Sequence, residues 1–186
     1  MSRHAPLLVL GLGNVLLGDD GVGGAAIALL RDRYRAPRGV QVLDGGTLGL
    51  ALLPYLQDAR TVILVDAIRA DSEPGSLVRL DGDQVAPAVA ARLSPHQIGV
   101  SDLLEGARWL GRYPARLVLV GLVPDTMDLV VGLSPRVAPS LDALVQAVVD
   151  EAAALGFPFT PAARPIADET PGAVGAIDVA RLVGVR

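Results

Sequence analysis

The chain has no cysteine, and only two of its 186 residues are histidines. The absence of cysteine excludes disulfides, thiolate metal sites and a cysteine nucleophile. Any metal ion must therefore be held by histidine, by carboxylates or by backbone oxygens. His4 lies in an N-terminal stretch that we expect to fray, so His96 is the candidate imidazole ligand.

Lysine is also absent, and sixteen arginines against twenty acidic residues leave a net charge of −4. This balance gives no support for nucleic-acid binding, which usually requires a basic patch. No apolar run reaches the roughly 18 residues that a membrane helix requires. The apolar N-terminal stretch leads into GLGN without a small-residue cleavage site, so it predicts a strand and not a signal peptide. We therefore expect a cytoplasmic protein that binds neither nucleic acid nor membrane; nothing in the sequence specifies an oligomeric state.

Hydrophobic residues account for 51% of the chain and charged residues for 19%, which is typical of an ordered globular protein. Buried strands are predicted at residues 6–12, 40–43, 61–65 and 117–123, with a weaker edge strand at 76–80. Helices are predicted from Asp19 or Asp20 to about Tyr34, and at residues 48–56, 101–110 and 139–155. This alternation predicts a three-layer, doubly wound α/β fold whose mostly parallel sheet carries helices on both faces.

The periodic pattern ends near Gly156. Residues 1–156 are therefore expected to form a single α/β domain. Residues 157–186 are expected to form an irregular, proline-rich tail, in which 176–185 add one or two turns of helix.

A glycine-rich turn, GLGNVLLGDDG at residues 11–21, follows the first predicted strand. Dinucleotide-binding folds hold pyrophosphate at this place, and Asp44 at the end of the second strand could pass for their ribose-binding acid. However, Leu16 occupies the position of the third glycine, and Asp19 and Asp20 lie where the phosphates would be. Because like charges repel at close range, the turn favours a cation over a phosphate.

Three side chains are candidate ligands of that cation. Asp20 follows the first strand and Asp66 ends the third, so both are expected at the edge where ligands of open α/β sheets bind. Both residues have a structural alternative: Asp20 would interact with the helix dipole, and Asp66 would form an Asx turn or a cap. The neighbouring Asp19 would serve as a helix cap.

His96 is the third candidate. Ser94 and Gln97 have the spacing of a capping box and Pro95 suits the first helical position, so His96 is expected in a helix's first turn. The helix dipole there keeps an imidazole neutral, which metal binding requires. A histidine that only packs at a helix start is the alternative. Two carboxylates and one imidazole suit a divalent ion such as Ni, Zn or Mn, and three ligands leave positions open for substrate.

Familiar peptidase motifs are missing. The chain contains neither HExxH nor GxSxG, which excludes an ordinary zinc peptidase and a serine hydrolase with a nucleophile elbow. The residues by themselves therefore predict an α/β domain with an open cation site.

Five segments in order resemble the hydrogenase maturation endopeptidases. They are GLGNVLLGDDGVG (11–23), LDGGTLG (43–49), VDAI (65–68), SPHQIG (94–99) and GLSPRV (132–137). The resemblance covers about residues 5–156. It implies a cytoplasmic protease that removes a short C-terminal extension from the large-subunit precursor of a nickel–iron hydrogenase, once nickel has been inserted.

The resemblance also implies roles for individual residues. Asp20, Asp66 and His96 match the family's nickel-contacting residues and are expected to be the catalytic ones. Some relatives have Glu at the first of these positions, where Asp20 is shorter by one methylene. Asp44, with Gly45 and Gly46, matches a segment linked to substrate binding.

In this scheme nickel arrives with the substrate and serves as a recognition element, and another divalent ion is the alternative in the isolated protein. Two other functions remain open from the residues. One is a non-enzymatic metal- or nucleotide-binding domain, and the other is a peptidase of the same fold with a different target, such as a spore protein.

Overall fold

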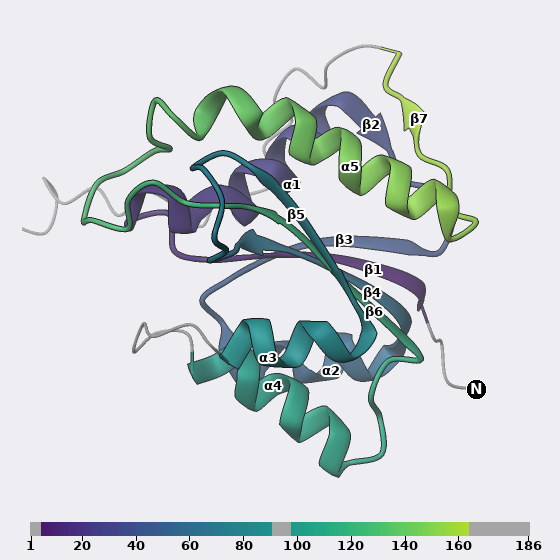
Figure 1. Ribbon diagram of the computed structural model, residues 1–186. Helices are drawn as coiled ribbons and strands as arrows, with labels where there is room; N and C mark the ends of the chain where they lie inside the picture. The colour runs from purple at the N-terminus through teal and green to yellow at the C-terminus, as the bar shows by residue number, and fades with distance from the viewer. Residues whose placement is uncertain (1–4, 91–97, 164–186) are drawn as a thin grey trace, which may run out of the picture.

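A five-stranded sheet lies between two layers of helices in the computed structural model, which describes residues 5–90 and 98–163 (Figure 1). The parallel strands are β1 (Ala5–Leu12), β3 (Val40–Gly46), β4 (Ala59–Ala67) and β6 (Arg116–Leu122). The order across the sheet is β3-β1-β4-β6-β5, in which β5 (Leu77–Asp81) runs antiparallel to β6 at one edge. The predicted fold class is confirmed.

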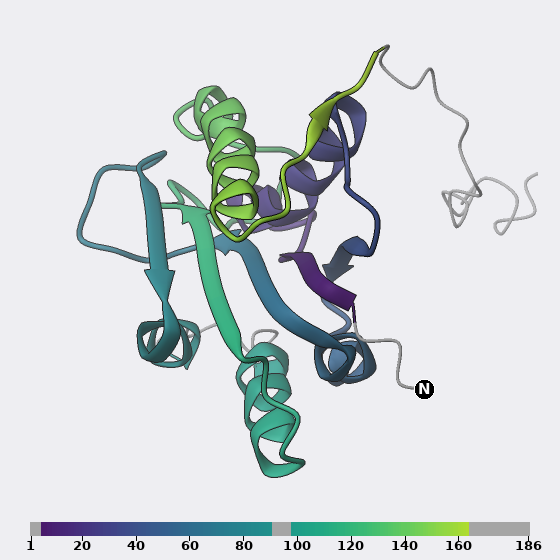
Figure 2. The ribbon, with the colours of Figure 1, turned by 90° about the vertical axis from the view of Figure 1, so that its right-hand side faces the viewer.

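Alternate residues of the central strands face opposite helical layers. Leu7 and Val9 of β1 belong to the core cluster of α1 (Val22–Arg33) and α5 (Leu141–Ala154). Leu8 and Leu10 belong to the cluster on the other face. That face carries α2 (Leu53–Asp58), α3 (Val85–Ala90) and α4 (Ile98–Trp109). Figure 2 shows the two layers on either side of the sheet. Each fully buried leucine stabilises the fold by roughly 1.5–3 kcal/mol, so the apolar runs specify a sheet covered on both faces.

The predicted helices differ in detail from those observed. Short 3-10 turns precede several helices: η1 (Gly18–Gly21), η2 (Gly49–Leu52), η3 (Gly82–Gln84) and η5 (Ala138–Ser140). The helix expected from Asp19 or Asp20 therefore begins only at Val22. The single helix expected at residues 48–56 is η2 followed by α2. The short α3 was not predicted.

The packed structure continues past residue 156, where the sequence placed the end of the domain. Phe159 is buried in the core cluster of α1 and α5. The short β7 (Thr160–Pro161) pairs antiparallel with β2 (Tyr34–Arg35), which is why α1 ends one residue before Tyr34. The helix expected at residues 176–185 lies outside the described residues.

Edge strand β5 is tied to α5 by a partly buried ion pair. The guanidinium of Arg79 donates to both carboxylate oxygens of Glu151, over 2.6 and 3.0 Å. These hydrogen bonds, together with one to Asp81, raise the pKa of Arg79 above its ordinary value. The pair holds the antiparallel edge strand against the helical layer.

None of the helices in the described segments is both long enough and apolar enough to cross a membrane.

Candidate functional site

Two buried carboxylates lie at the carboxyl edge of the sheet. Asp66 is the penultimate residue of β4, and Asp20 lies in η1, which follows β1 and packs against β4. Because β1 and β4 are adjacent and parallel, their carboxyl ends meet at the same edge. Asp20 is 4% exposed and Asp66 is 1% exposed. The expectation that both carboxylates lie at this edge therefore agrees with the fold.

Backbone N–H groups orient both carboxylates. The N–H of Asn14 donates to Oδ2 of Asp20 over 2.7 Å, and the N–H of Ala67 donates to Oδ1 of Asp66 over 2.7 Å. Each contact fixes the orientation of one carboxylate oxygen. Two oriented, buried carboxylates can bind a cation or accept a proton.

Two glycines allow the chain to approach these residues closely. Gly13 has a φ of 117°, and a Cβ on it would overlap the backbone carbonyl of Asp20. Gly121 of β6 is paired with Asp66, and a Cβ there would overlap the Asp66 carbonyl. Glycine is therefore required at both positions for steric reasons.

Asp19 has a role that the sequence did not reveal. Its side chain is fully buried and accepts backbone hydrogen bonds from Ser134 at 2.7 Å, Asp125 at 2.9 Å and Thr126 at 3.1 Å. Burial raises the pKa of Asp19, but these hydrogen bonds outweigh it and hold the pKa below the ordinary value. The capping role considered for Asp19 is wrong, because its carboxylate binds the loop after β6 and no side-chain cap is present at η1 or α1.

The same two loops also pair through their backbones. The N–H of Gly18 donates to the carbonyl of Val130 over 2.8 Å, and the N–H of Asp19 donates to the carbonyl of Thr126 over 3.1 Å. Leu17 and Val130 form an isolated parallel bridge. The loop after β6 thereby holds the glycine-rich turn that carries Asp20.

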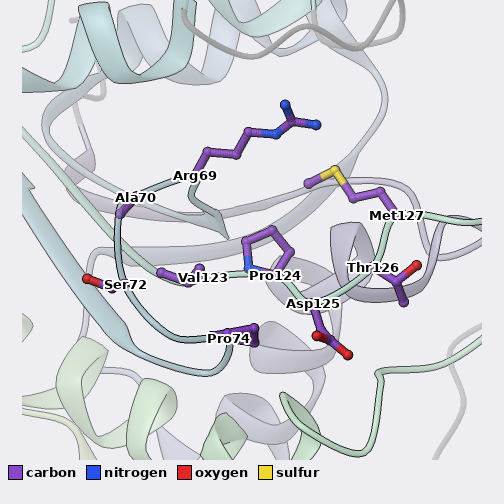
Figure 3. A pocket seen from close by; sticks show the side chains of 9 residues that line it. All are labelled: Arg69, Ala70, Ser72, Pro74, Val123, Pro124, Asp125, Thr126 and Met127. Atoms are coloured by element: carbon purple, nitrogen blue, oxygen red, sulfur yellow. The ribbon is translucent and has the colours of Figure 1, made fainter.

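A cavity of about 430 Å³ opens beyond the ends of β4 and β6 (Figure 3). Arg69, three residues after Asp66, lines it together with Thr126 and Met127. Asp125 also lines it but is paired with Arg136 at 2.8 Å. Asp66 itself does not line this cavity, which no sequence pattern predicted.

Asp44, Gly45 and Gly46 are the last three residues of β3, which extends past the strand predicted at residues 40–43. Asp44 is paired with Gly11 and Gly46 with Leu12, so they reach the same edge as the site. Oδ1 of Asp44 accepts a hydrogen bond from the N–H of Gly46 over 3.1 Å. Gly45 is buried between strand and helix side chains, whereas the Asp44 carboxylate is exposed and lines a second cavity, of about 360 Å³.

His96 lies outside the described residues, so its place in the site stays a prediction. Across residues 5–90 and 98–163, no three of the His, Asp and Glu side chains form a group that could hold a metal ion. The described part of the site is thus the pair Asp20 and Asp66, with Asp44 nearby at the sheet edge.

Comparison with known proteins places this chain in a family. The family model described as hydrogenase maturation protease matches residues 25–151, which include Asp44 and Asp66 but begin after Asp20. The hydrogenase 2 maturation protease of Escherichia coli (strain K12) is 35% identical over 144 residues, covering 77% of this chain and 88% of that protein. The hydrogenase expression/formation protein HupD of Bradyrhizobium diazoefficiens is 39% identical over 155 residues, covering 80% and 81%.

Solved structures give the same result. The hydrogenase maturating endopeptidase HybD from E. coli matches with a TM-score of 0.79 at 33% identity, over 83% of this chain and 96% of that chain. The [NiFe] hydrogenase maturation protease HybD from Thermococcus kodakarensis matches with a TM-score of 0.64 at 28% identity, over 78% and 98%. The resemblance inferred from the five sequence motifs is confirmed: the chain belongs to the hydrogenase maturation protease family.

Proposed function

We propose that this protein is an endopeptidase that removes the C-terminal extension from the large-subunit precursor of a nickel–iron hydrogenase in the cytoplasm, after nickel insertion. The observation that carries the proposal is the pair of buried, oriented carboxylates Asp20 and Asp66 at one sheet edge. It is supported by the membership of the chain in a family of hydrogenase maturation proteases.

In this proposal, nickel is part of the substrate and marks it as ready for cleavage. Carboxylate oxygens and a neutral imidazole are suitable ligands for Ni²⁺, so Asp20, Asp66 and His96 would contact the ion carried by the precursor. Few ligands suffice, because the precursor already holds the metal. Docking on nickel would bring the scissile bond to the sheet edge, and proximity alone accelerates a reaction strongly.

The carboxylates also provide a proton acceptor. Attack of water on the scissile carbonyl carbon releases a proton, which Asp20 or Asp66 would accept and then pass to the departing amine. General-base assistance of this kind typically contributes about 10²–10⁴-fold to a rate. Asp44 would bind the substrate chain as it leaves the site along β3.

The test is cleavage of purified precursor, loaded with nickel or free of it, by the wild-type chain and by Asp20→Asn, Asp66→Asn and His96→Gln. Each variant should lower the rate at least about 100-fold. Asp142→Asn is the matched control, because Asp142 is exposed on α5 and forms an ion pair with the exposed Arg33. Equal cleavage of both precursor forms would contradict nickel recognition and favour a peptidase with another target.

The non-enzymatic alternative has its own test. Titration calorimetry with NAD, FAD and ATP should show no binding, because Asp19 and Asp20 bring negative charge to the glycine-rich turn. Micromolar binding of any of the three would favour a nucleotide-binding domain.

A further inference from the structure

An apolar surface lies on the two loops that Asp19 joins. It consists of Val15, Leu16, Leu129, Val130 and Val131, each of which is at least half exposed. Leu129 and Val131 are 82% and 76% exposed. We call these five residues the loop patch.

The loop patch combines residues from two distant parts of the sequence that the fold brings together. Val15 and Val131 line the same cavity, and Val130 is bridged to Leu17. A cluster of aliphatic side chains in water is unfavourable, and such patches on soluble proteins commonly mark interaction sites.

The surroundings of the loop patch indicate which kind of partner it binds. The 360 Å³ cavity continues from Val15 and Val131 over a floor of glycine and alanine, with Asp44 at its rim. Asp128, also exposed, adjoins Leu129. An aliphatic surface with an acidic border is complementary to an aliphatic segment flanked by basic residues.

The position of the loop patch relates it to the site. Leu16 and Asp20 lie on the same short turn, and Asp19 fixes this turn to the loop that carries Leu129. A chain bound on the patch would therefore continue directly to the carboxylates. A second copy of this protein is a poorer occupant, because stable interfaces involve about 20–30 residues from each side and the patch has five.

We propose that the loop patch docks an aliphatic, base-flanked segment of the substrate precursor, independently of nickel; this rests on the proposed function. The patch would contribute to binding of the precursor and would leave the chemical step unchanged. Loss of patch contacts is therefore expected to raise KM, whereas loss of Asp66 lowers kcat.

The experiment uses the double variant Leu129→Ser/Val131→Ser in the full chain. Its matched control is Trp109→Ser/Leu110→Ser, which also removes two exposed apolar side chains. That pair lies at the end of α4, near the start of β4, away from the carboxyl edge. The loop-patch variant should raise KM for nickel-loaded precursor about tenfold and leave kcat within about twofold, whereas the control changes neither.

Binding of nickel-free precursor, measured by calorimetry, separates docking from cleavage. The loop-patch variant should bind about tenfold more weakly than the wild-type chain, with an unchanged melting temperature. A synthetic aliphatic peptide flanked by lysines should compete with the precursor, and the same peptide flanked by glutamates should not.

The outcomes distinguish the two proposals. If the wild-type chain cleaves the precursor and the loop-patch variant binds it equally well, docking on the patch is wrong. If the wild-type chain binds but never cleaves, the proposed function is wrong and the docking surface stands. If the wild-type chain sediments as a dimer and the loop-patch variant as a monomer, the patch binds a second copy of this protein and the docking proposal is wrong.

Discussion

The carboxylate of Asp19 accepts a hydrogen bond from the backbone N–H of Ser134 over 2.7 Å, although 115 positions separate the two residues. The bond joins the turn after β1 to the loop after β6. Asp20 is the next residue along the chain, so its place at the sheet edge depends on this contact. Asp19 is thus a positioning residue for the site, and Asp20 and Asp66 are the proposed catalytic ones.

Asp19→Asn should destabilise the protein. The asparagine side chain would direct its NH₂ group toward at least one backbone N–H that donates to a carboxylate oxygen in the wild-type chain. The remaining hydrogen bonds would lose the negative charge of their acceptor. The free energy of unfolding should fall by about 2–3 kcal/mol. Denaturation in urea measures the change, with the exposed Asp142→Asn as control; a difference below about 0.5 kcal/mol would refute the role of Asp19.

The stability of the protein should depend on pH through Asp19. Its pKa is lower in the folded chain than the ordinary 3.8. The contribution of the charged Asp19 to the free energy of unfolding is therefore fully present above pH 3.8. It is lost as the pH falls through the folded-state pKa. Unfolding followed by circular dichroism between pH 6 and 2 should show a shallower acid dependence in Asp19→Asn than in the wild-type chain. Identical pH profiles would mean that Asp19 is not held in its charged form.

Gly13→Ala should impair the site by a steric route. The new Cβ would overlap the carbonyl of Asp20, and φ of 117° is unfavourable for any residue with a side chain. The turn must shift, so cleavage of precursor should decrease at least about tenfold. Gly82→Ala is the matched control, because Gly82 also has a positive φ, of 55°, but nothing within 4 Å of the added carbon. Equal activity of the two variants would contradict the close approach at Asp20.

Asp20→Glu should be tolerated better than Asp20→Asn. Glutamate keeps the negative charge and the oxygen ligands, and its extra methylene changes only the reach, whereas asparagine removes the charge needed for a cation or a proton. We expect Asp20→Glu to retain cleavage within about tenfold of the wild type and Asp20→Asn to lose about 100-fold or more. Single-turnover cleavage of nickel-loaded precursor measures both; the reverse ranking would exclude a role for the charge.

Arg79→Met should destabilise the edge of the sheet without altering the site. It leaves the carboxylate of Glu151, 8% exposed, without its bidentate partner. Because the Arg79 side chain is 44% exposed, the expected cost is about 1–3 kcal/mol. Removing both charges with Arg79→Met/Glu151→Met should restore much of the stability. A double-mutant cycle by urea denaturation tests this, and additive effects of the two changes would show that the pair is not coupled.

The sequence alone determined the sheet and the identity of the family. Residues 6–12 and 61–65 are nearly continuous apolar runs, and their length and their flanking residues favour strands buried on both faces. Because such strands are parallel and their carboxyl ends meet at one edge, the sequence also predicted where Asp66 and the turn with Asp20 would lie. The ordered motifs, read together, identified the hydrogenase maturation proteases.

Only the tertiary structure decided what the neighbouring residues do. Asp19 and Asp20 are adjacent and chemically alike, yet one carboxylate binds the loop after β6 and the other is held by Asn14 at the sheet edge. Local patterns predicted a helix cap for Asp19, because its partners lie more than a hundred residues away. The loop patch was equally hidden, because its two loops are joined only by pairing of Leu17 and Gly18 with Val130, more than a hundred residues away. Sequence periodicity reports local geometry and burial, whereas contacts across long separations exist only once the chain has folded.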